Sequence, residues 1–248
     1  MPNELILGDC FAKLKEIPDR SVNAIITDPP YFTTNLKFDK EKFSWSELWA
    51  ELKRVIKPTG IVLVFGQMRS AIEVIEANKK WFRYDIIWEK TMATGFFDAN
   101  IRPLRSHEII LVFSKNLKNT TYNPQMGIGE MYSRNRSGTA AHYSQGTSRI
   151  PTVNNGERYP KDVIKFANNN YQSPHPTAKP VDLINYLVKT YSNEGELILD
   201  PFGGSGTTAI ACLETNRNYL VIEKDEAYHA VSEQRIIQWH NQQLNLFG

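Results

Sequence analysis

Hydrophobic positions along the chain follow two spacings that alternate. Short runs of hydrophobic and β-branched residues predict strands, and stretches with a hydrophobic residue every three or four positions predict helices between several of them. The predicted strands are Leu5–Leu7, Val22–Thr27, Ile61–Phe65, Tyr84–Trp88, Glu108–Phe113, Leu197–Asp200 and Tyr219–Ile222. The predicted helices are Trp45–Ile56, Arg69–Asn78, Val181–Tyr191, Thr207–Thr215 and Ala227–Trp239. This alternation predicts an open α/β fold with a seven-stranded, mostly parallel sheet and helices on both faces.

Two segments depart from the alternation. Residues 89–107 have no helical period, so the strands on either side of them are predicted to form an antiparallel pair at one edge of the sheet. Residues 114–173 are rich in Asn, Thr, Ser, Gly, Tyr and Arg and have no sustained period, which predicts an inserted, irregular module. The predicted organisation is therefore a first part of the sheet domain at 1–113, an insertion at 114–173 and a second part of the sheet domain at 174–248.

Composition narrows the class of protein. The chain has 248 residues, of which 41% are hydrophobic, enough for one sizeable core. It contains no apolar run approaching the roughly 20 residues that span a bilayer, and its first residues do not resemble a signal peptide, so we expect a soluble, cytoplasmic protein with no membrane partner. Cys10 and Cys212 lack the spacing of a disulfide framework or a zinc site, and the five histidines show no ligand spacing, so no metal is predicted.

Charge is unevenly distributed. Residues 102–165 carry ten basic and four acidic side chains, a net charge of +6, whereas the whole chain carries only +2. Local positive charge of this size suits a phosphate backbone, although a solvated loop with scattered arginines would look similar. The candidate phosphate-contacting residues, which would be DNA contacts if the partner is DNA, are Arg102, Arg105, Arg134 and Arg136.

The first candidate site is a stiff turn after a predicted central strand. Asp28, Pro29, Pro30 and Tyr31 follow Val22–Thr27 directly. Neither proline can donate a hydrogen bond to the sheet, and each fixes its own φ near −65°, so the strand must end there. The turn presents a carboxylate, carbonyl oxygens and an aromatic ring.

The second candidate site is a glycine-rich loop between a strand and a helix. It begins at Asp200-Pro201-Phe202 and continues through Gly203, Gly204, Ser205, Gly206 and Thr207. The glycines allow a tight turn and close approach of a ligand, and the helix amino terminus offers unpaired N–H groups. Glu223, at the end of the next strand, is a candidate for ribose hydroxyls. The loop alone does not separate a nicotinamide cofactor from S-adenosylmethionine.

Together, the two sites resemble the motifs of the amino-group DNA methyltransferases. Asp28-Pro29-Pro30-Tyr31 is similar to their catalytic motif, and the loop from Asp200 to Thr207 to their cofactor motif. The order of the motifs, with an insertion between them, resembles the β class. Gly8-Asp9-Cys10, Ser106-His107-Glu108 and the segment from His175 to Pro180 resemble further parts of that class. The resemblance covers nearly the whole chain except 114–173, and it implies a circularly permuted, Rossmann-like fold in which 114–173 recognises the target.

The resemblance also implies roles for individual residues. Asp28 and the Pro29 carbonyl would accept hydrogen bonds from the amino group of a base flipped out of double-stranded DNA, and Tyr31 would stack on that base. Lys179 would pair with the carboxylate of S-adenosylmethionine. The remaining expected cofactor contacts are Asp9, Cys10, Asp200, Phe202, Gly203, Gly204, Ser205, Gly206, Thr207 and Glu223. The class also makes a homodimer possible.

Several alternatives remain at this point. Aspartate rather than serine at position 28 favours N6 of adenine over N4 of cytosine as the methyl acceptor. An RNA or protein-amide methyltransferase shares the chemistry but usually has asparagine before the prolines. Two more remote alternatives are a nicotinamide-dependent oxidoreductase and a DNA-binding protein that has lost its catalytic activity. The sequence reveals neither the target sequence nor whether a restriction enzyme accompanies the protein.

Overall fold

The computed structural model describes residues 3–30, 43–134, 152–168 and 178–247. Contacts divide the chain into a larger unit, Met1–Asn123 with Asp162–Gly248, and a smaller unit, Pro124–Lys161. Each unit is described by itself. No helix in the described part of the chain is long and apolar enough to cross a membrane.

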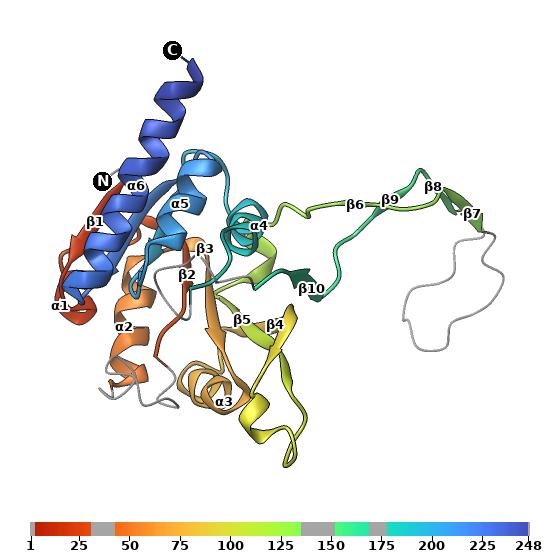
Figure 1. Cartoon of the computed structure of the whole chain (residues 1–248), viewed down its shortest axis with the longest axis horizontal. Helices are drawn as coiled ribbons and strands as arrows, with labels where there is room; N and C mark the ends of the chain where they lie inside the picture. The colour runs from red at the N-terminus through yellow and green to blue at the C-terminus, as the bar shows by residue number, and fades with distance from the viewer. Residues whose placement is uncertain (1–2, 31–42, 135–151, 169–177, 248) are drawn as a thin grey trace. The chain divides into compact units, whose positions relative to one another are not determined.

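The larger unit is built on one eight-stranded sheet with the order β1-β12-β11-β2-β3-β5-β4-β10 (Figure 1). β5 is antiparallel to both of its neighbours, and the other adjacent strands are parallel. In sheet order, the strands are β1 (Glu4–Leu7), β12 (Asn218–Glu223), β11 (Leu197–Asp200), β2 (Val22–Thr27), β3 (Ile56–Gly66), β5 (Arg105–Ser114), β4 (Phe82–Thr94) and β10 (Val163–Phe166). The predicted mostly parallel α/β sheet is confirmed.

β10 corrects one detail of the prediction. The antiparallel pairing of β4 with β5 is as predicted, but this pair is not at the edge, because Val163–Phe166 adds an eighth strand beyond β4. These four residues fall in the segment expected to be irregular. Val163, Ile164 and Phe166 are hydrophobic, but the run is only four residues long and only Ile164 among them is buried. The pairing with β4 stabilises this strand instead, supported by a hydrogen bond of 3.0 Å from the Trp88 indole to the Phe166 carbonyl.

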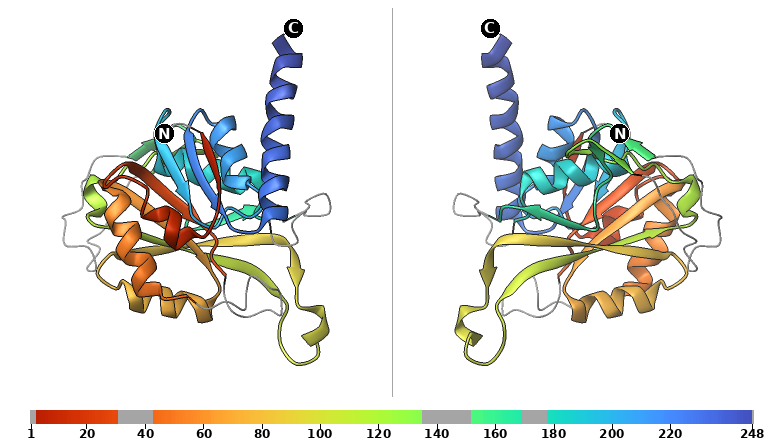
Figure 2. Two further views of the ribbon diagram at one scale, coloured as in Figure 1. Left: turned by 90° about the vertical axis from the view of Figure 1, so that its left-hand side faces the viewer. Right: turned by 90° about the vertical axis from the view of Figure 1, so that its right-hand side faces the viewer.

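Helices cover both faces of the sheet (Figure 2). Successive side chains of a strand point to opposite faces. Ala24 and Ile26 of β2 accordingly pack in the core that contains α4 and α5, whereas Ile25 packs in the core that contains α1, α2 and α3. The helices are α1 (Cys10–Leu14), α2 (Trp45–Val55), α3 (Met68–Ala77), α4 (Val181–Tyr191), α5 (Thr207–Glu214) and α6 (Glu226–Phe247). Helices on both faces are thus confirmed, and each of the five predicted helices is present.

Three short helical elements and the end of one helix were not predicted from the hydrophobic spacing. α1 has five residues, too few to show a period, and it begins because the Asp9 side chain accepts hydrogen bonds from the Phe11 and Ala12 N–H groups. Single 3-10 turns lie at η2 (Phe96–Asp98) and η3 (Leu117–Asn119). α6 continues eight residues past the predicted end at Trp239, and its carboxyl-terminal part extends beyond the sheet (Figure 2).

The described residues of the smaller unit, Pro124–Lys161, form two antiparallel strand pairs. β6 (Gly127–Ile128) pairs with β9 (Glu157–Arg158), and β7 (Tyr132–Arg134) pairs with β8 (Thr152–Asn154). Arg158 joins the two pairs by donating to the Asn154 side chain and the Glu130 carbonyl, and it lies 5.0 Å from the Tyr132 ring centroid. No hydrophobic side chain in the described part of this unit is buried. Polar contacts rather than a core hold these strands together.

Candidate active site

The stiff turn after β2 lies beside the end of β11. Ala24 and Ile25 pair with Ile198 and Leu199 in parallel register. The chain runs from β2 to β3 on one side and from β11 to β12 on the other, so the strand order reverses between β2 and β11. Ligands of such sheets bind outside the carboxyl ends of the strands at the point of reversal. Asp28 and Asp200 lie at the carboxyl ends of these two strands, where a ligand site is expected.

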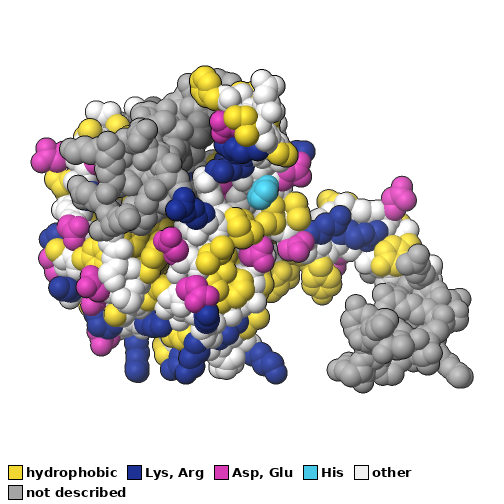
Figure 3. Space-filling model, turned by 90° about the horizontal axis from the view of Figure 1, so that it is seen from below, with side chains coloured by type: hydrophobic (Ala, Val, Ile, Leu, Met, Phe, Trp, Pro, Cys, Tyr) yellow, Lys and Arg dark blue, Asp and Glu magenta, His cyan; other side chains and the backbone are white. Residues whose placement is uncertain are grey.

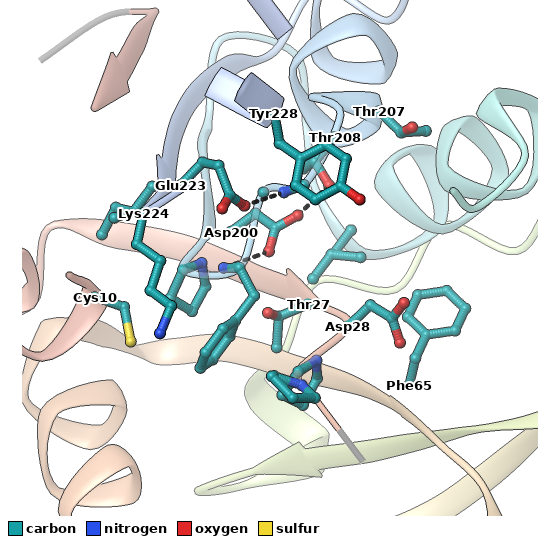
Figure 4. A pocket seen from close by; sticks show the side chains of 18 of the residues that line it. Cys10, Thr27, Asp28, Phe65, Asp200, Thr207, Thr208, Glu223, Lys224 and Tyr228 are labelled. Atoms are coloured by element: carbon teal, nitrogen blue, oxygen red, sulfur yellow. Dashed lines mark hydrogen bonds between the residues drawn. The ribbon is translucent and has the colours of Figure 1, made fainter. Parts of the chain in front are cut away.

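A cavity of about 760 Å³ opens at this point. It is lined by both candidate sites, including Asp28, Pro29 and Pro30 from the turn and Asp200 to Ser205 from the glycine loop. Figure 4 shows Asp28 beside Phe65 on one side of the pocket and Asp200 and Glu223 on the other. The volume lies within the roughly 300–1,000 Å³ of small-molecule sites. The two motifs therefore meet in one crevice.

Asp200 organises the glycine loop. One of its carboxylate oxygens accepts from the Phe202 N–H at 3.1 Å, and the other accepts from the Thr208 hydroxyl at 2.6 Å. The side chain is buried, and burial raises its pKa to about 6 although both hydrogen bonds act in the opposite direction. Asp200 thereby links the end of β11 to the first turn of α5 across the loop.

Helix α6 supports the same loop from behind. The Ser232 hydroxyl donates to the Gly204 carbonyl at 2.9 Å, and Arg235 donates to the Ser205 hydroxyl at 3.1 Å and the Thr207 hydroxyl at 3.3 Å. Gly206 has φ +74°, and a Cβ there would lie 2.8 Å from the Ser232 Cβ. Glycine is therefore required at position 206 both by backbone conformation and by the approach of α6.

Glu223 and the amino-terminal segment form another wall of the cavity. β1 pairs with β12 so that Leu7 is opposite Glu223, which brings Asp9 and Cys10 next to this acid. The Glu223 carboxylate accepts from the Gly204 N–H at 2.7 Å and from the Asp225 N–H at 2.8 Å. Burial raises the pKa of Glu223, and it raises that of the Cys10 thiol to about 12. Cys10 is a neutral part of the wall.

A chain of alternating charges lies next to the catalytic turn. The Lys179 ammonium forms an ion pair with Asp28 and lies 3.3 Å from Glu108 Oε2. Lys90 forms an ion pair with the other oxygen of Glu108. Burial acts to lower the pKa of Lys179, but Asp28 and Glu108 together hold it above its ordinary value. Burial likewise acts to raise the pKa of Glu108, and the two lysines hold it below its ordinary value.

Comparison with known proteins identifies the family. A family model described as DNA methylase, covering N6 and N4 methyltransferases, matches residues 22–234. The chain belongs to this family. The type II methyltransferase M.HinfI of Haemophilus influenzae is 30% identical over 260 residues, which cover 94% of this chain and 68% of M.HinfI. The DNA adenine methyltransferase YhdJ of Escherichia coli (strain K12) is 27% identical over 253 residues, which cover 94% of this chain and 82% of YhdJ.

Solved structures agree at the level of the fold. The crystal structure of the M1.HpyAVI–SAM complex superimposes with a TM-score of 0.63 at 22% identity, covering 94% of this methylase and 98% of M1.HpyAVI. The predictions of a methyltransferase fold and of a DNA methyltransferase are confirmed.

The cavity brings together most of the predicted site residues of the methylase. Asp28, Pro29 and Pro30 line the cavity, as do these predicted cofactor contacts: Asp9, Cys10, Lys179, Asp200, Phe202, Gly203, Gly204, Ser205, Thr207 and Glu223. Gly206 shapes the loop without being among the lining residues. Lys179 contacts Asp28, so its expected pairing with the cofactor carboxylate stays a prediction.

The predicted DNA contacts are more dispersed. Arg102 and Arg105 belong to the connection from β4 to β5, where Arg102 forms a 2.5 Å ion pair with Asp98 and Arg105 donates to the Gln67 side chain. Arg134 ends β7 in the smaller unit, and its side chain lies outside the described part. Arg136 and Tyr31 lie outside the described residues, as do residues 175–177. Their predicted roles stay predictions.

Sequence reasoning missed several cavity residues. Phe43 stacks on Phe202 with ring centroids 5.5 Å apart, and Lys224 and Tyr228 also line the cavity. Glu108 was noted as the start of a strand and as part of the segment Ser106-His107-Glu108, without a role in the site, although a charged residue opening a run of buried hydrophobic residues was a usable signal. Ser232 and Arg235 of α6 gave a weaker signal, because polar side chains three residues apart on one helix face are common on surfaces.

Proposed function

We propose that this methylase transfers a methyl group from S-adenosylmethionine to N6 of an adenine in a short sequence of double-stranded DNA. The observation that carries the proposal is the shared cavity, into which Asp28 and the glycine loop both open. One part of the cavity offers carboxylate and carbonyl acceptors suited to an amino group, and the other offers the backbone and acid suited to a nucleoside cofactor.

The residues of the loop fit S-adenosylmethionine. Each carboxylate oxygen of Glu223 accepts one backbone N–H, and each has a second lone pair for a ribose hydroxyl. The Phe43 and Phe202 rings give the cavity a flat apolar surface. Gly204 has φ +53°, which lets the loop backbone face the ligand without a side chain between them. When bound there, S-adenosylmethionine would supply an electrophilic sulfonium methyl group.

The catalytic turn acts on the base. N6 of adenine is a weak nucleophile because its lone pair is delocalised into the ring. The Asp28 carboxylate and the Pro29 carbonyl would each accept a hydrogen bond from one of its two N–H groups. These hydrogen bonds favour a pyramidal nitrogen and restore the lone pair. Fixed acceptors also stabilise the positive charge that develops on nitrogen, and the proton released afterwards is held at Asp28. Asp28 therefore needs no unusual basicity.

The base must leave the duplex to reach this turn, and unpaired bases are held by stacking. Phe97 at the tip of the β4–β5 connection is fully exposed, as is most of Ile101. Apolar side chains of this kind insert between base pairs in other DNA-binding proteins. Hydrophobic, basic and acidic side chains intermix on the face seen in Figure 3. We assign this tip to the duplex beside the flipped adenine, with Arg102 and Arg105 on phosphates.

Arg102 is suited to a phosphate contact because its present partner is replaceable. Its ion pair with Asp98 is nearly half exposed, and exposed pairs contribute about 0–1 kcal/mol. The smaller unit and the basic segment around it, including Arg134 and Arg136, would recognise the target sequence. A place in a restriction-modification system, a cytoplasmic location and a homodimer stay predictions; light scattering of the purified protein measures the last of these.

The alternative acceptor is N4 of cytosine. It would need the same acceptor pair, and Asp28 favours adenine only by resemblance. A nicotinamide-dependent oxidoreductase would leave Asp28, Pro29 and Pro30 without a role. The family assignment disfavours that reading and also disfavours a non-catalytic relic, since both motifs are intact.

One experiment separates these readings. The protein is incubated with duplex DNA and S-adenosylmethionine that carries a deuterated methyl group, and the digested nucleosides are analysed by mass spectrometry. We expect labelled N6-methyladenine from the wild type and none from Asp28→Ala. Calorimetry should find the variant's affinity for S-adenosylhomocysteine within a few-fold of wild type, because Asp28 acts on the base. Label on cytosine, or wild-type turnover by Asp28→Ala, would overturn the proposal.

A further inference from the structure

We propose that Lys179, held in place by Glu108, is a positioning residue that fixes the Asp28 carboxylate for methyl transfer, an inference that rests on the proposed function. The two residues belong to an ion chain that we define as Asp28, Lys179, Glu108 and Lys90. The chain begins at the catalytic carboxylate and leads away from it across the sheet.

The four members of the ion chain come from four separate elements. Asp28 follows β2, Glu108 lies on β5, Lys90 lies on β4, and Lys179 precedes α4. Trp88 is opposite Glu108 in the antiparallel register, which brings Lys90, two residues along β4, to the same face. The ring of Phe65 on β3, 5.1 Å from the Lys179 ammonium, covers that ammonium. The arrangement therefore spans the strand that carries the catalytic acid and the three next to it.

The three members of the ion chain other than Asp28 are shielded from water. The side chains of Lys179, Glu108 and Lys90 are 9%, 11% and 10% exposed, whereas that of Asp28 is 26% exposed and faces the cavity. Buried ions carry a desolvation cost, so such a chain contributes little net stability. What it provides is a fixed orientation, because each charge is held by the neighbouring charges of opposite sign.

The ion chain is compatible with the proposed role of Asp28 as a hydrogen-bond acceptor for the base. A carboxylate has about four acceptor positions, so a hydrogen bond from Lys179 is compatible with others from the amino group of the base. An ammonium alone beside Asp28 would offset the negative charge that stabilises the methylated nitrogen. Glu108 shares that ammonium, so Asp28 is oriented while much of its own charge still acts on the base.

A rival role makes a different prediction. If Lys179 instead binds the carboxylate of S-adenosylmethionine, its removal weakens cofactor binding and leaves turnover at saturating cofactor unchanged. Glu108→Gln and Lys179→Met would be non-additive under either role, because the two side chains contact each other. A positioning role instead predicts a loss in kcat at saturating cofactor, from both Lys179→Met and Glu108→Gln.

The test uses the full-length protein with duplex DNA. Lys179→Met, Lys179→Arg, Glu108→Gln and the double variant Glu108→Gln/Lys179→Met are compared with wild type. Lys79→Met is the matched control, because Lys79 forms an exposed ion pair with Glu76, away from the cavity. Measured quantities are kcat at saturating S-adenosylmethionine across pH, the affinity for S-adenosylhomocysteine, and the melting temperature.

We expect Lys179→Met to lower kcat on the order of 10²-fold, as a displaced catalytic group does. The acidic limb of its kcat profile should move up by about 1 pH unit or more, because a neighbouring positive charge favours an ionised carboxylate. Charged groups facing Asp28 include Lys179, Glu108 beyond it, and Asp200 at the end of β11. Asp200 is present in both proteins, so the shift between them reports Lys179. Lys179→Arg should restore the acidic limb but only part of kcat.

Each other outcome has a definite reading. Unchanged kcat and pH profile with a lowered melting temperature would overturn the inference in favour of a structural role. A loss of S-adenosylhomocysteine affinity without a loss of kcat would overturn it in favour of the rival role. Should Lys179→Met fail to fold, Lys179→Arg and Glu108→Gln decide the question, and wild-type kcat in both would refute positioning. A wild type that methylates no DNA overturns the proposed function and the inference with it.

Discussion

Gly206→Ala is the sharpest test of how the cofactor loop is held. Gly206 has φ +74°, and Gly195 in the turn before β11 has φ +76°. A Cβ at position 195 would meet no atom within 4 Å, whereas one at 206 would lie 2.8 Å from Ser232 Cβ. The two substitutions therefore share the backbone strain and differ in the contact with α6, so Gly195→Ala is the matched control.

The magnitudes follow from these two differences. Left-handed backbone at a non-glycine residue costs roughly 1–2 kcal/mol, which both variants bear. Overpacking adds about 1–3 kcal/mol in Gly206→Ala alone. At about 2–4 °C per kcal/mol for a domain of this size, Gly195→Ala should lower the melting temperature by roughly 2–8 °C and Gly206→Ala by roughly 4–20 °C.

Only Gly206→Ala should also weaken cofactor binding. Displacing Ser232 breaks its 2.9 Å hydrogen bond to the Gly204 carbonyl, which lies in the part of the loop proposed to face the ligand. We expect at least a tenfold loss of S-adenosylhomocysteine affinity, equivalent to about 1.4 kcal/mol. Differential scanning fluorimetry and calorimetry measure the two effects. Equal melting temperatures for the two variants, with wild-type affinity in both, would refute the argument that α6 shapes the loop.

Three further predictions concern charge and exposed surface. Because the folded-state pKa of Asp200 is raised to about 6, its contribution to stability is present at low pH and is lost as pH rises through about 6. The melting temperature of Asp200→Asn relative to wild type should therefore increase from pH 4 to pH 7, and a constant difference would contradict the shift. Replacing Arg134 and Arg136 together by alanine should reduce the slope of log affinity against log salt by about 1.8 if both contact phosphates, whereas a loss confined to one DNA sequence would indicate base contacts. Phe97→Ser should lower turnover on duplex DNA more than on DNA with a mismatched target base, and equal losses on both would argue against insertion.

Sequence patterns predicted the features that depend on residues close together in the chain, namely strands, their ends and the glycine loop. The short run of hydrophobic and β-branched residues at Val22–Thr27 predicted a strand, and the two prolines after it predicted where that strand ends. The glycine loop was predicted because a tight turn that a ligand approaches closely requires glycine, and the loop contains three glycines in four residues. Both candidate sites could therefore be found from the sequence alone.

The parts that escaped prediction depend on partners far apart in the chain. Lys179 and Asp28 are 151 positions apart, and nothing near either residue reveals the other. β10 forms because β4 offers it an edge, and its own four residues bury little. Ser232 and Arg235 reach the glycine loop only after α6 has packed. Tertiary contacts of this kind leave no periodic signal.

The strand order also has a consequence during synthesis of the protein. The Leu197 N–H of β11 donates a hydrogen bond to the Asn23 side chain of β2, a separation of 174 positions, so the central strand pair closes only after β11 has been made. Until then, one edge of β2 lacks its final partner, and unpaired strand edges promote association between chains. Pairings between distant segments also slow folding. A ribosome-bound fragment that ends before β11 should therefore depend on chaperones, whereas the completed chain should not.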